Sequence, residues 1–446
     1  MAIIKLIIYF LSIILPGYLI LLLTSKQEIK SIFFKLALAY GLGAYFITIQ
    51  LFIWFFLCRF AFSSWFYLIL TAELILLAVA VQKRGLLKLS SNIDIKLRNK
   101  LKVSELVIIL LIIIQLIFLF SNALSRPVVT FDSLAHWSFK AKVLYYENRV
   151  DFNPESNIYL VGGGHINYPW LVPLMQFWLH NILGEYNDLL INLIFVFYFI
   201  SILVIVYYFI KEYLSRFYSM LFVFFLSSMP LFFYHGFNAY ADQVLSCYIL
   251  TGFIFLYYWF KQLDNKSLIL SSIFFSIALF VKNEAIIFII TGLVAIVFYL
   301  LIKKIKIKIL FYYIVFVLLP VTPWLIFKLI HDLGVNSIES NNIGFHPEVF
   351  KFIAQAMFIA GSWNIWWFIV VITIILNFKY IIKNKTLLSG WLFLLISFSG
   401  FIILYLFTDQ YHFVIDNTAV SRNILTLIPV SVAIVAITFS EKFKTE

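Results

Sequence analysis

The chain has 446 residues, of which 63% are hydrophobic, 20% aromatic and only 12% charged, and its mean hydropathy is +1.01. A soluble globular protein carries far more charge than this, so the composition excludes one and predicts an integral membrane protein. The net charge of +12 does not require a nucleic acid partner, because the basic residues lie where anionic lipid head groups are expected.

Apolar stretches that are long enough to cross a bilayer recur along the whole chain. A membrane-spanning helix needs roughly 20 mostly apolar residues, and short charged segments separate such stretches here. The pattern predicts an all-α fold, a polytopic transmembrane helix bundle of about thirteen helices. The first stretch is interpreted as a span, because no small-residue cleavage site follows it. The predicted spans are 3–23, 36–57, 65–81, 104–124, 189–210, 217–234, 243–260, 267–281, 285–302, 309–327, 358–378, 387–407 and 423–439.

The positions of Lys and Arg predict the orientation, because basic residues near helix ends are retained in the cytoplasm. One set of alternate segments holds 23 of the 33 basic residues. We therefore expect the N-terminus outside and the C-terminus in the cytoplasm of a plasma membrane or a bacterial-type inner membrane. The two cysteines, Cys58 and Cys247, lie in or at the end of helices, which leaves neither a disulfide framework nor a cysteine-based metal site.

A basic segment from Lys83 to Lys102 marks the predicted boundary between N-terminal helices, 1–103, and a transmembrane core, 104–446. The core opens with a span and then a long external loop, 125–188, which is too long for an ordinary connection.

Two parts of this loop are expected to be interfacial helices. Residues 133–147 mix apolar and charged side chains as such helices do. Residues 170–183 are apolar but too short to span, so we expect them to lie on or dip into the membrane. With the external segments 329–348 and 408–422, every external polar cluster can converge around the mouth of one bundle.

The first polar cluster follows the fourth span and contains Asp132, His136 and Lys140. A carboxylate held beside aromatic residues at a membrane surface can act as a general base or bind a cation. On spacing alone, a helix N-cap is the favoured alternative for Asp132. The sequence identifies no cofactor and leaves the use of a divalent metal open.

The second cluster is the turn Gly162-Gly163-Gly164 with His165 and Tyr168. Three glycines permit a tight turn near a ligand, but a turn before a proline-started helix needs the same residues. The third is Asp242, a carboxylate at the outer start of a span, where a helix cap is the alternative.

The fourth cluster is Lys282-Asn283-Glu284, which interrupts an otherwise apolar stretch. Each ionised group near the bilayer costs about 2.5 to 3.5 kcal/mol, so such groups are usually paired or functional; a tight external hairpin is the alternative. The fifth contains His412 and Arg422 before the last span. An arginine there suits bidentate phosphate recognition, or pairs with an external carboxylate.

In this order, the clusters resemble the GT-C class of integral membrane glycosyltransferases, which includes protein O-mannosyltransferases and lipid A aminoarabinose transferases. The resemblance covers residues from about 104 to 440. Its motifs are Asp132 at the start of the first external loop, Tyr168-Pro169 before a short apolar segment, Tyr240-x-Asp242 opening a later helix, Lys282-Asn283-Glu284 between two helices, and Arg422 before a Leu-rich helix with Pro429.

The resemblance implies an inverting transfer of a sugar from a polyprenyl-phosphate donor to a hydroxyl of a lipid, glycan or protein acceptor on the external face. It implies that Asp132 is the base or the acceptor-orienting carboxylate and that Asp242 is a second catalytic carboxylate. Lys282 and Arg422 would bind the donor phosphate. The remaining candidate substrate-binding residues are His136, Lys140, His165, Tyr168, Glu284 and His412.

Two other functions fit a membrane protein with external polar clusters. A transporter or flippase for a lipid-linked or polar solute would favour broken helices in matching halves and charges at the bilayer midplane, and the sequence has neither pattern. A polysaccharide polymerase or ligase would also use a lipid-linked sugar, but its long external loop is expected late in the chain rather than at 125–188.

Overall fold

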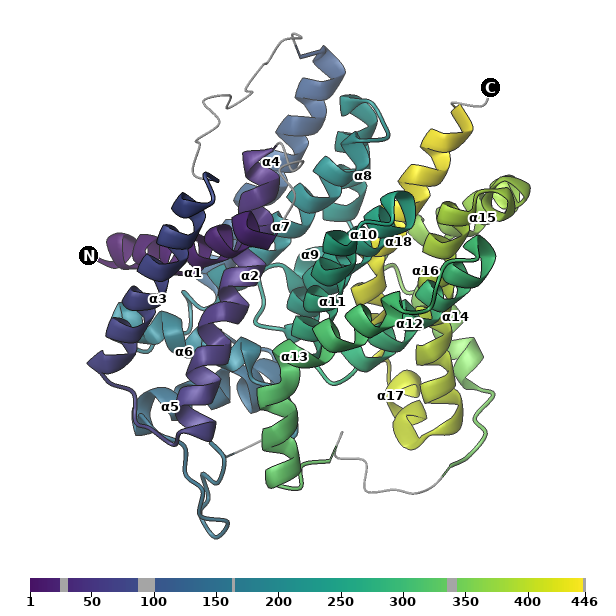
Figure 1. The fold of residues 1–446 in the computed structure, drawn as a ribbon. Coiled ribbons are helices and arrows are strands. Elements are labelled where there is room, and N and C mark those ends of the chain that lie inside the picture. Colours follow the sequence, from purple (N-terminus) through teal and green to yellow (C-terminus); the bar gives the residue numbers. More distant parts are fainter. Residues whose placement is uncertain (25–30, 87–100, 163–164, 335–342, 444–446) are drawn as a thin grey trace.

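The structure, a computed structural model, describes all residues except 25–30, 87–100, 163–164, 335–342 and 444–446 (Figure 1). The described residues form helices and loops with no strand, which confirms the predicted all-α class. Within them, eleven helices are long and apolar enough to cross a membrane. These are α1 (Ala2–Thr24), α2 (Ile32–Phe52, extended by η1, Ile53–Leu57), α3 (Ser64–Lys83), α4 (Val103–Ser125), α7 (Asn192–Lys211), α10 (Ala241–Gln262), α12 (Ala285–Lys303), α13 (Ile309–Ile330), α15 (Trp366–Lys383), α16 (Lys385–Phe407) and α18 (Val420–Phe443).

Shorter helices connect and cover this bundle. They are η2 (Ser133–Trp137), α5 (Ser138–Glu147), α6 (Leu171–Leu183), α8 (Arg216–Ser227), α9 (Pro230–His235), α11 (Asn265–Leu279), α14 (Val349–Phe358), η3 (Asp409–Tyr411) and α17 (His412–Ile415).

The predicted number of about thirteen spans is not confirmed, because two predicted spans fall on short helices. The span predicted at 217–234 is divided into α8 and α9, since Pro230 starts a new helix and Met229 before it is extended, with φ −70° and ψ 121°. The span predicted at 267–281 is α11, whose 15 residues rise only about 22 Å. The span predicted at 358–378 begins later, at α15, after a turn that includes Gly361 with φ +73°.

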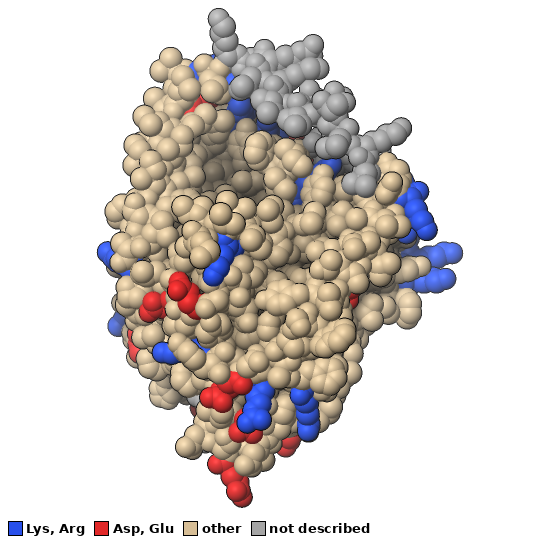
Figure 2. Space-filling model, turned by 90° about the vertical axis from the view of Figure 1, so that its left-hand side faces the viewer, with Lys and Arg blue, Asp and Glu red and all other residues tan. Residues whose placement is uncertain are grey.

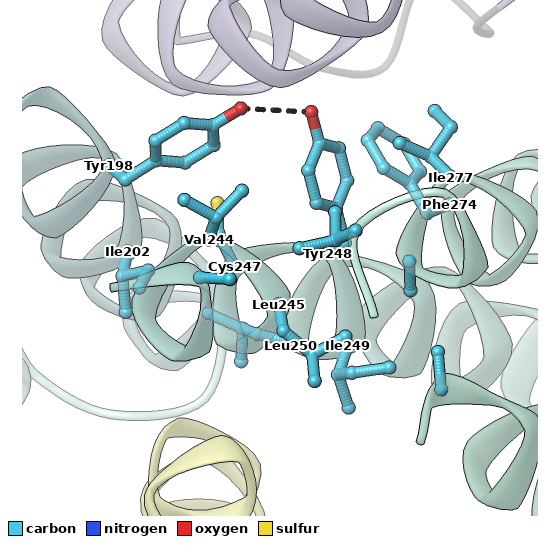
Figure 3. Close-up of a cluster of buried hydrophobic side chains, with 14 of the residues drawn as sticks. Tyr198, Ile202, Val244, Leu245, Cys247, Tyr248, Ile249, Leu250, Phe274 and Ile277 are labelled. Carbon is cyan, nitrogen blue, oxygen red and sulfur yellow. Dashed lines mark hydrogen bonds between the residues drawn. The ribbon is translucent and has the colours of Figure 1, made fainter. Parts of the chain in front are cut away.

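The centre of the bundle is formed by α7, α10 and α18, and α10 packs against both of the others. Almost every side chain of α10 is buried. Figure 3 shows Tyr198 of α7 and Tyr248 of α10 pointing toward one another in this core, with their hydroxyl oxygens 3.0 Å apart. The Tyr248 hydroxyl also donates to the carbonyl of Gly41 in α2, 2.8 Å away. Hydroxyl groups buried among apolar side chains thus find partners and tie three helices together.

The N-terminal helices pack closely on the core. A Cβ atom built on Gly43 of α2 would lie 1.7 Å from the backbone oxygen of Ile13 in α1, so only glycine lets these two backbones approach. Helices α1, α2 and α5 surround α6. As a result α6 is buried by other helices on nearly all sides, a packing that the expectation that residues 170–183 lie on or dip into the membrane did not include.

Part of the long loop 125–188 and most of the acidic side chains visible on one face lie toward the same end of the molecule (Figure 1 and Figure 2). In Figure 1, α5 and α17 lie at the lower end, opposite the C-terminus. On the face in Figure 2 most of the surface is uncharged, and the acidic side chains gather mainly in its lower half. The candidate site residues Asp242, Lys282 and Arg422 lie at or beside the ends of α10, α11 and α18.

Candidate active site

Arg422 lies between two carboxylates that are distant from each other in the sequence. Its Nη2 atom is 2.6 Å from Asp132 Oδ2 and 2.9 Å from Asp242 Oδ2, and its Nε atom donates to the same Asp242 oxygen at 3.1 Å. The other Asp242 oxygen, Oδ1, is 3.0 Å from the Nζ atom of Lys282. Lys282 Nζ is also 3.1 Å from Glu284 Oε1. The five side chains form one continuous ion network in the order Asp132, Arg422, Asp242, Lys282 and Glu284.

Helix packing explains why these five residues meet. Asp242 lies in the first turn of α10 and Arg422 in the first turn of α18, and the two helices pack side by side. Lys282 lies in the turn that joins α11 to α12, and both of these helices contact α10. Asp132 directly precedes η2 near the start of the long loop, and the neighbouring Ser133 donates to the carbonyl of Ala239, just before α10, at 2.7 Å.

The carboxylates do not act as helix caps, which was the alternative interpretation for both. Asp132 occupies the N-cap position of η2, but no side-chain hydrogen bond caps that helix. The N-cap position of α10 is Tyr240, again without a side-chain cap. Asp132 and Asp242 direct their oxygens to the cations instead.

The network is most buried at its centre. The Asp242 side chain is completely buried, whereas those of Asp132 and Arg422 are 24% and 20% exposed. Burial by itself lowers the pKa of Lys282, but Asp242 and Glu284 outweigh it and hold that pKa above its usual range. A buried carboxylate with two cationic partners is paired in the way that a low-dielectric environment requires.

Two aromatic rings support this network, and neither was among the predicted site residues. The Arg422 guanidinium carbon is 4.9 Å from the centroid of the Tyr240 ring. Tyr240 stacks on His235, with ring centroids 4.5 Å apart and an interplanar angle of 25°. His235 Nδ1 is in turn 4.0 Å from Asp242 Oδ2. The Tyr-x-Asp motif contained a signal for Tyr240. Nothing in the sequence pointed to His235, because it directly follows the stretch 217–234 that was predicted as one continuous span.

A second group, composed of rings and a lysine, lies on the long loop 125–188. The His136 and His165 rings are 4.7 Å apart, and Tyr168 is 5.1 Å from His165 and 6.0 Å from His136. Lys140 Nζ donates to the carbonyls of His165 and Tyr168 at 2.8 and 3.3 Å, and it lies 4.6 Å from the Trp170 ring centroid. These contacts hold the segment after the glycine turn against α5.

Burial sets the protonation of this ring group. Burial and the adjacent His165 lower the pKa of His136 to about 4, so His136 is neutral at neutral pH. Burial lowers the pKa of Lys140 to about 7. Burial and Glu284 raise the pKa of Tyr168 to about 12. The group therefore offers uncharged rings and hydrogen-bonding edges, which suit a polar organic substrate.

Two hydrogen bonds to backbone carbonyls connect the ring group to the ion network. Asn283 donates through Nδ2 to the carbonyl of Asn167 at 3.1 Å. The N–H of Leu171 donates to the carbonyl of Phe280 at 3.2 Å. The turn that carries Lys282 is thereby attached to the loop segment that carries Tyr168.

Nine of the ten predicted site residues lie in these two adjacent groups. His412 does not: it is exposed, its ring lies 3.9 Å from that of Tyr411, and no contact of the described residues joins it to either group. Of the predicted glycine turn, Gly162 has φ +60°, while Gly163 and Gly164 lie outside the described residues.

Across the described part of the chain, no group of three or more His, Cys, Asp or Glu side chains is arranged to hold a metal ion.

Comparison with known proteins gives one family and one solved structure. Residues 167–327 match the family described as dolichyl-phosphate-mannose-protein mannosyltransferase, a stretch that includes Asp242 and Lys282. The fold is similar to that of ArnT from Cupriavidus metallidurans, solved bound to undecaprenyl phosphate, with a TM-score of 0.51 and 11% sequence identity. That alignment covers 76% of this chain and 60% of the ArnT chain.

A search of curated proteins finds no significant match. The family match and the fold nevertheless agree, and they confirm the predicted resemblance to the GT-C class of membrane glycosyltransferases.

Proposed function

We propose that this protein is an integral membrane glycosyltransferase that moves a sugar from a polyprenyl-phosphate donor to an acceptor hydroxyl on the external face. The observation that carries the proposal is the ion network. It places a partly exposed carboxylate, Asp132, directly beside the cation Arg422. A second cation, Lys282, belongs to the same network through Asp242. An acceptor hydroxyl needs a nearby base, and a leaving lipid phosphate needs nearby cations.

The proposed step is a single displacement with inversion at the sugar. The acceptor oxygen forms a bond to the anomeric carbon while the bond from that carbon to the phosphate oxygen breaks. The hydroxyl proton passes to Asp132. The negative charge that develops on the departing phosphate is stabilised by Lys282 and Arg422.

Asp242 has a different role in this proposal from that of Asp132. It is completely buried, and its two oxygens already accept hydrogen bonds from both cations. We assign it to holding Lys282 and Arg422 at a fixed spacing for the phosphate. The ring group of His136, His165 and Tyr168 is assigned to the sugar or the acceptor, because aromatic rings stack on sugars and imidazole edges hydrogen-bond hydroxyls.

The orientation proposed for the protein places this site outside, with an external N-terminus and a cytoplasmic C-terminus. The distribution of 23 of the 33 basic residues on the opposite side supports it. The Nζ atom of Lys5 also hydrogen-bonds the carbonyl of Leu183, so the start of α1 lies beside the external loop. The partners are a polyprenyl-phosphate-linked sugar, a lipid, glycan or protein acceptor, and the membrane of a bacterial-type cell.

The direct test is transfer of radiolabel from polyprenyl-phosphate sugars by the protein purified in lipid. We expect transfer by the wild type, and losses of about 100-fold or more in Asp132→Asn, which removes the base, and in Arg422→Ala, which removes a phosphate ligand. Matched controls are Glu155→Gln and Arg149→Ala, two exposed residues of the same external loop, which should keep full activity.

A transporter would give a different result in the same preparation. Solute flux in proteoliposomes, without transfer from any donor to any acceptor, would contradict the glycosyltransferase and favour the transporter. Equal activity of wild type and Asp132→Asn would contradict the assignment of the base.

A further inference from the structure

Neither cation of the ion network is free to receive a phosphate. Arg422 is held between Asp132 and Asp242, and Lys282 is held between Asp242 and Glu284. When all five groups are ionised, three carboxylates and two cations leave the network with a net charge of −1. A phosphate that simply added to this network would bring more negative charge into a partly desolvated place, which is unfavourable.

The carboxylates at the two ends of the ion network are more exposed to solvent than the carboxylate at its centre. The side chains of Asp132 and Glu284 are 24% and 15% exposed, whereas that of Asp242 is 0% exposed. An end carboxylate that leaves its cation can be solvated by water. Asp242 cannot leave without becoming an unpaired buried charge, which costs far more.

We propose that the donor phosphate binds by exchange: its oxygens take the place of Asp132 on Arg422 and of Glu284 on Lys282, while Asp242 keeps both cations in position. The proposal rests on the proposed function, since it needs a phosphate to bind at these cations. It adds that Asp132 is occupied by Arg422 in the empty site and is released toward the acceptor only when the donor has bound.

Exchange has a consequence for the order of events. An Asp132 oxygen 2.6 Å from the guanidinium already accepts a charge-assisted hydrogen bond and is not placed to take a proton from a hydroxyl. A donor phosphate on Arg422 removes that partner. Acceptor activation therefore follows donor binding, which prevents the base from acting in an empty site.

The test measures binding of undecaprenyl phosphate, without a sugar, to the full chain in lipid nanodiscs. In Asp132→Asn the phosphate no longer competes with a carboxylate for Arg422, so we expect binding about three- to tenfold tighter than in wild type, although turnover is lost. Glu155→Gln removes one negative charge from the same loop at an exposed position and should leave the affinity unchanged.

A double-mutant cycle with Arg422→Gln separates exchange from a general effect of charge. If Asp132 acts through Arg422, Asp132→Asn should no longer tighten the binding of undecaprenyl phosphate in the Arg422→Gln background. If the effect is long-range repulsion, the same tightening should persist in the Arg422→Gln background, and that result would overturn the exchange. Inorganic phosphate as a competitor should show the same pattern among the variants, because the exchange concerns the phosphate and not the lipid.

The remaining outcomes also decide the question. Glu284→Gln should tighten phosphate binding in the same way, because it frees Lys282 from its end carboxylate. This variant replaces Asp132→Asn in the test if Asp132→Asn does not fold. Unchanged or weaker binding in both variants, with normal binding by the wild type, overturns the exchange but leaves the proposed function intact. No binding of undecaprenyl phosphate by the wild type overturns both.

Discussion

The Lys140 ammonium group faces backbone carbonyls instead of a carboxylate, although its side chain is completely buried. Burial lowers its pKa to about 7, while the two carbonyls and the Trp170 ring favour the charged form. Its two hydrogen bonds fix the loop segment that carries His165 and Tyr168. We regard Lys140 as a residue that positions the ring group and not as one that meets the substrate directly.

Burial favours the neutral form of Lys140, whereas the two carbonyls and the Trp170 ring favour its charged form. The balance between them can be measured as a pH dependence of stability. Between pH 7 and pH 10 the unfolded chain binds a proton at Lys140 that the folded chain does not, so folding is favoured as the pH rises. We expect the stability of wild type relative to Lys140→Met to increase by roughly 1 kcal/mol per pH unit from pH 7 to 9, measured by thermal unfolding in detergent. A difference that does not change with pH would mean that the carbonyls and Trp170 keep Lys140 charged.

At the scale of whole helices, the close crossing of α1 and α2 depends on Gly43. The ideal Cβ position at Gly43 is 1.7 Å from the Ile13 oxygen, and this oxygen belongs to backbone that no rotamer change can move away. Gly43→Ala should therefore separate the two helices and lower the free energy of unfolding by about 2 to 4 kcal/mol.

The measurement for Gly43→Ala is the apparent melting temperature of the purified protein, followed by tryptophan fluorescence. Ala72→Val is a suitable control, because it adds bulk at an exposed position of α3. Equal melting of Gly43→Ala and wild type would contradict the close approach of α1 and α2.

Hydropathy predicted the long helices well, because an apolar span and its charged flanks lie together in one continuous stretch of sequence. The short helices were less predictable. The apolar stretch 217–234 continues through Pro230, so its composition resembles one span although the backbone breaks there. The burial of α6 was not predictable either, since an apolar 13-residue helix looks the same whether lipid or α1 and α2 cover it.

At the scale of the whole molecule, the sequence predicted a type and a position for each candidate site residue, but it left the partner of Arg422 open between a phosphate and an external carboxylate. Arg422 and Asp132 are almost 300 positions apart. They meet only in the folded chain, where α18 packs against α10 and Ser133, next to Asp132, hydrogen-bonds the carbonyl of Ala239 just before α10. For the same reason the support of Arg422 by Tyr240 could not be foreseen. His412 lies near Arg422 in the sequence, but among the described residues its ring contacts Tyr411 and no contact joins it to the ion network or the ring group.

The orientation of the whole molecule remains the prediction on which the external site depends, and labelling can test it. In a background with the exposed Cys58 replaced by serine, Glu155→Cys places a thiol in the long loop and Lys306→Cys places one between α12 and α13, both at exposed positions. Because basic segments stay in the cytoplasm, an impermeant maleimide on intact cells should label Glu155→Cys and should label Lys306→Cys only after permeabilisation. The reverse pattern would place the ion network on the cytoplasmic side, and the donor and acceptor would then have to meet there.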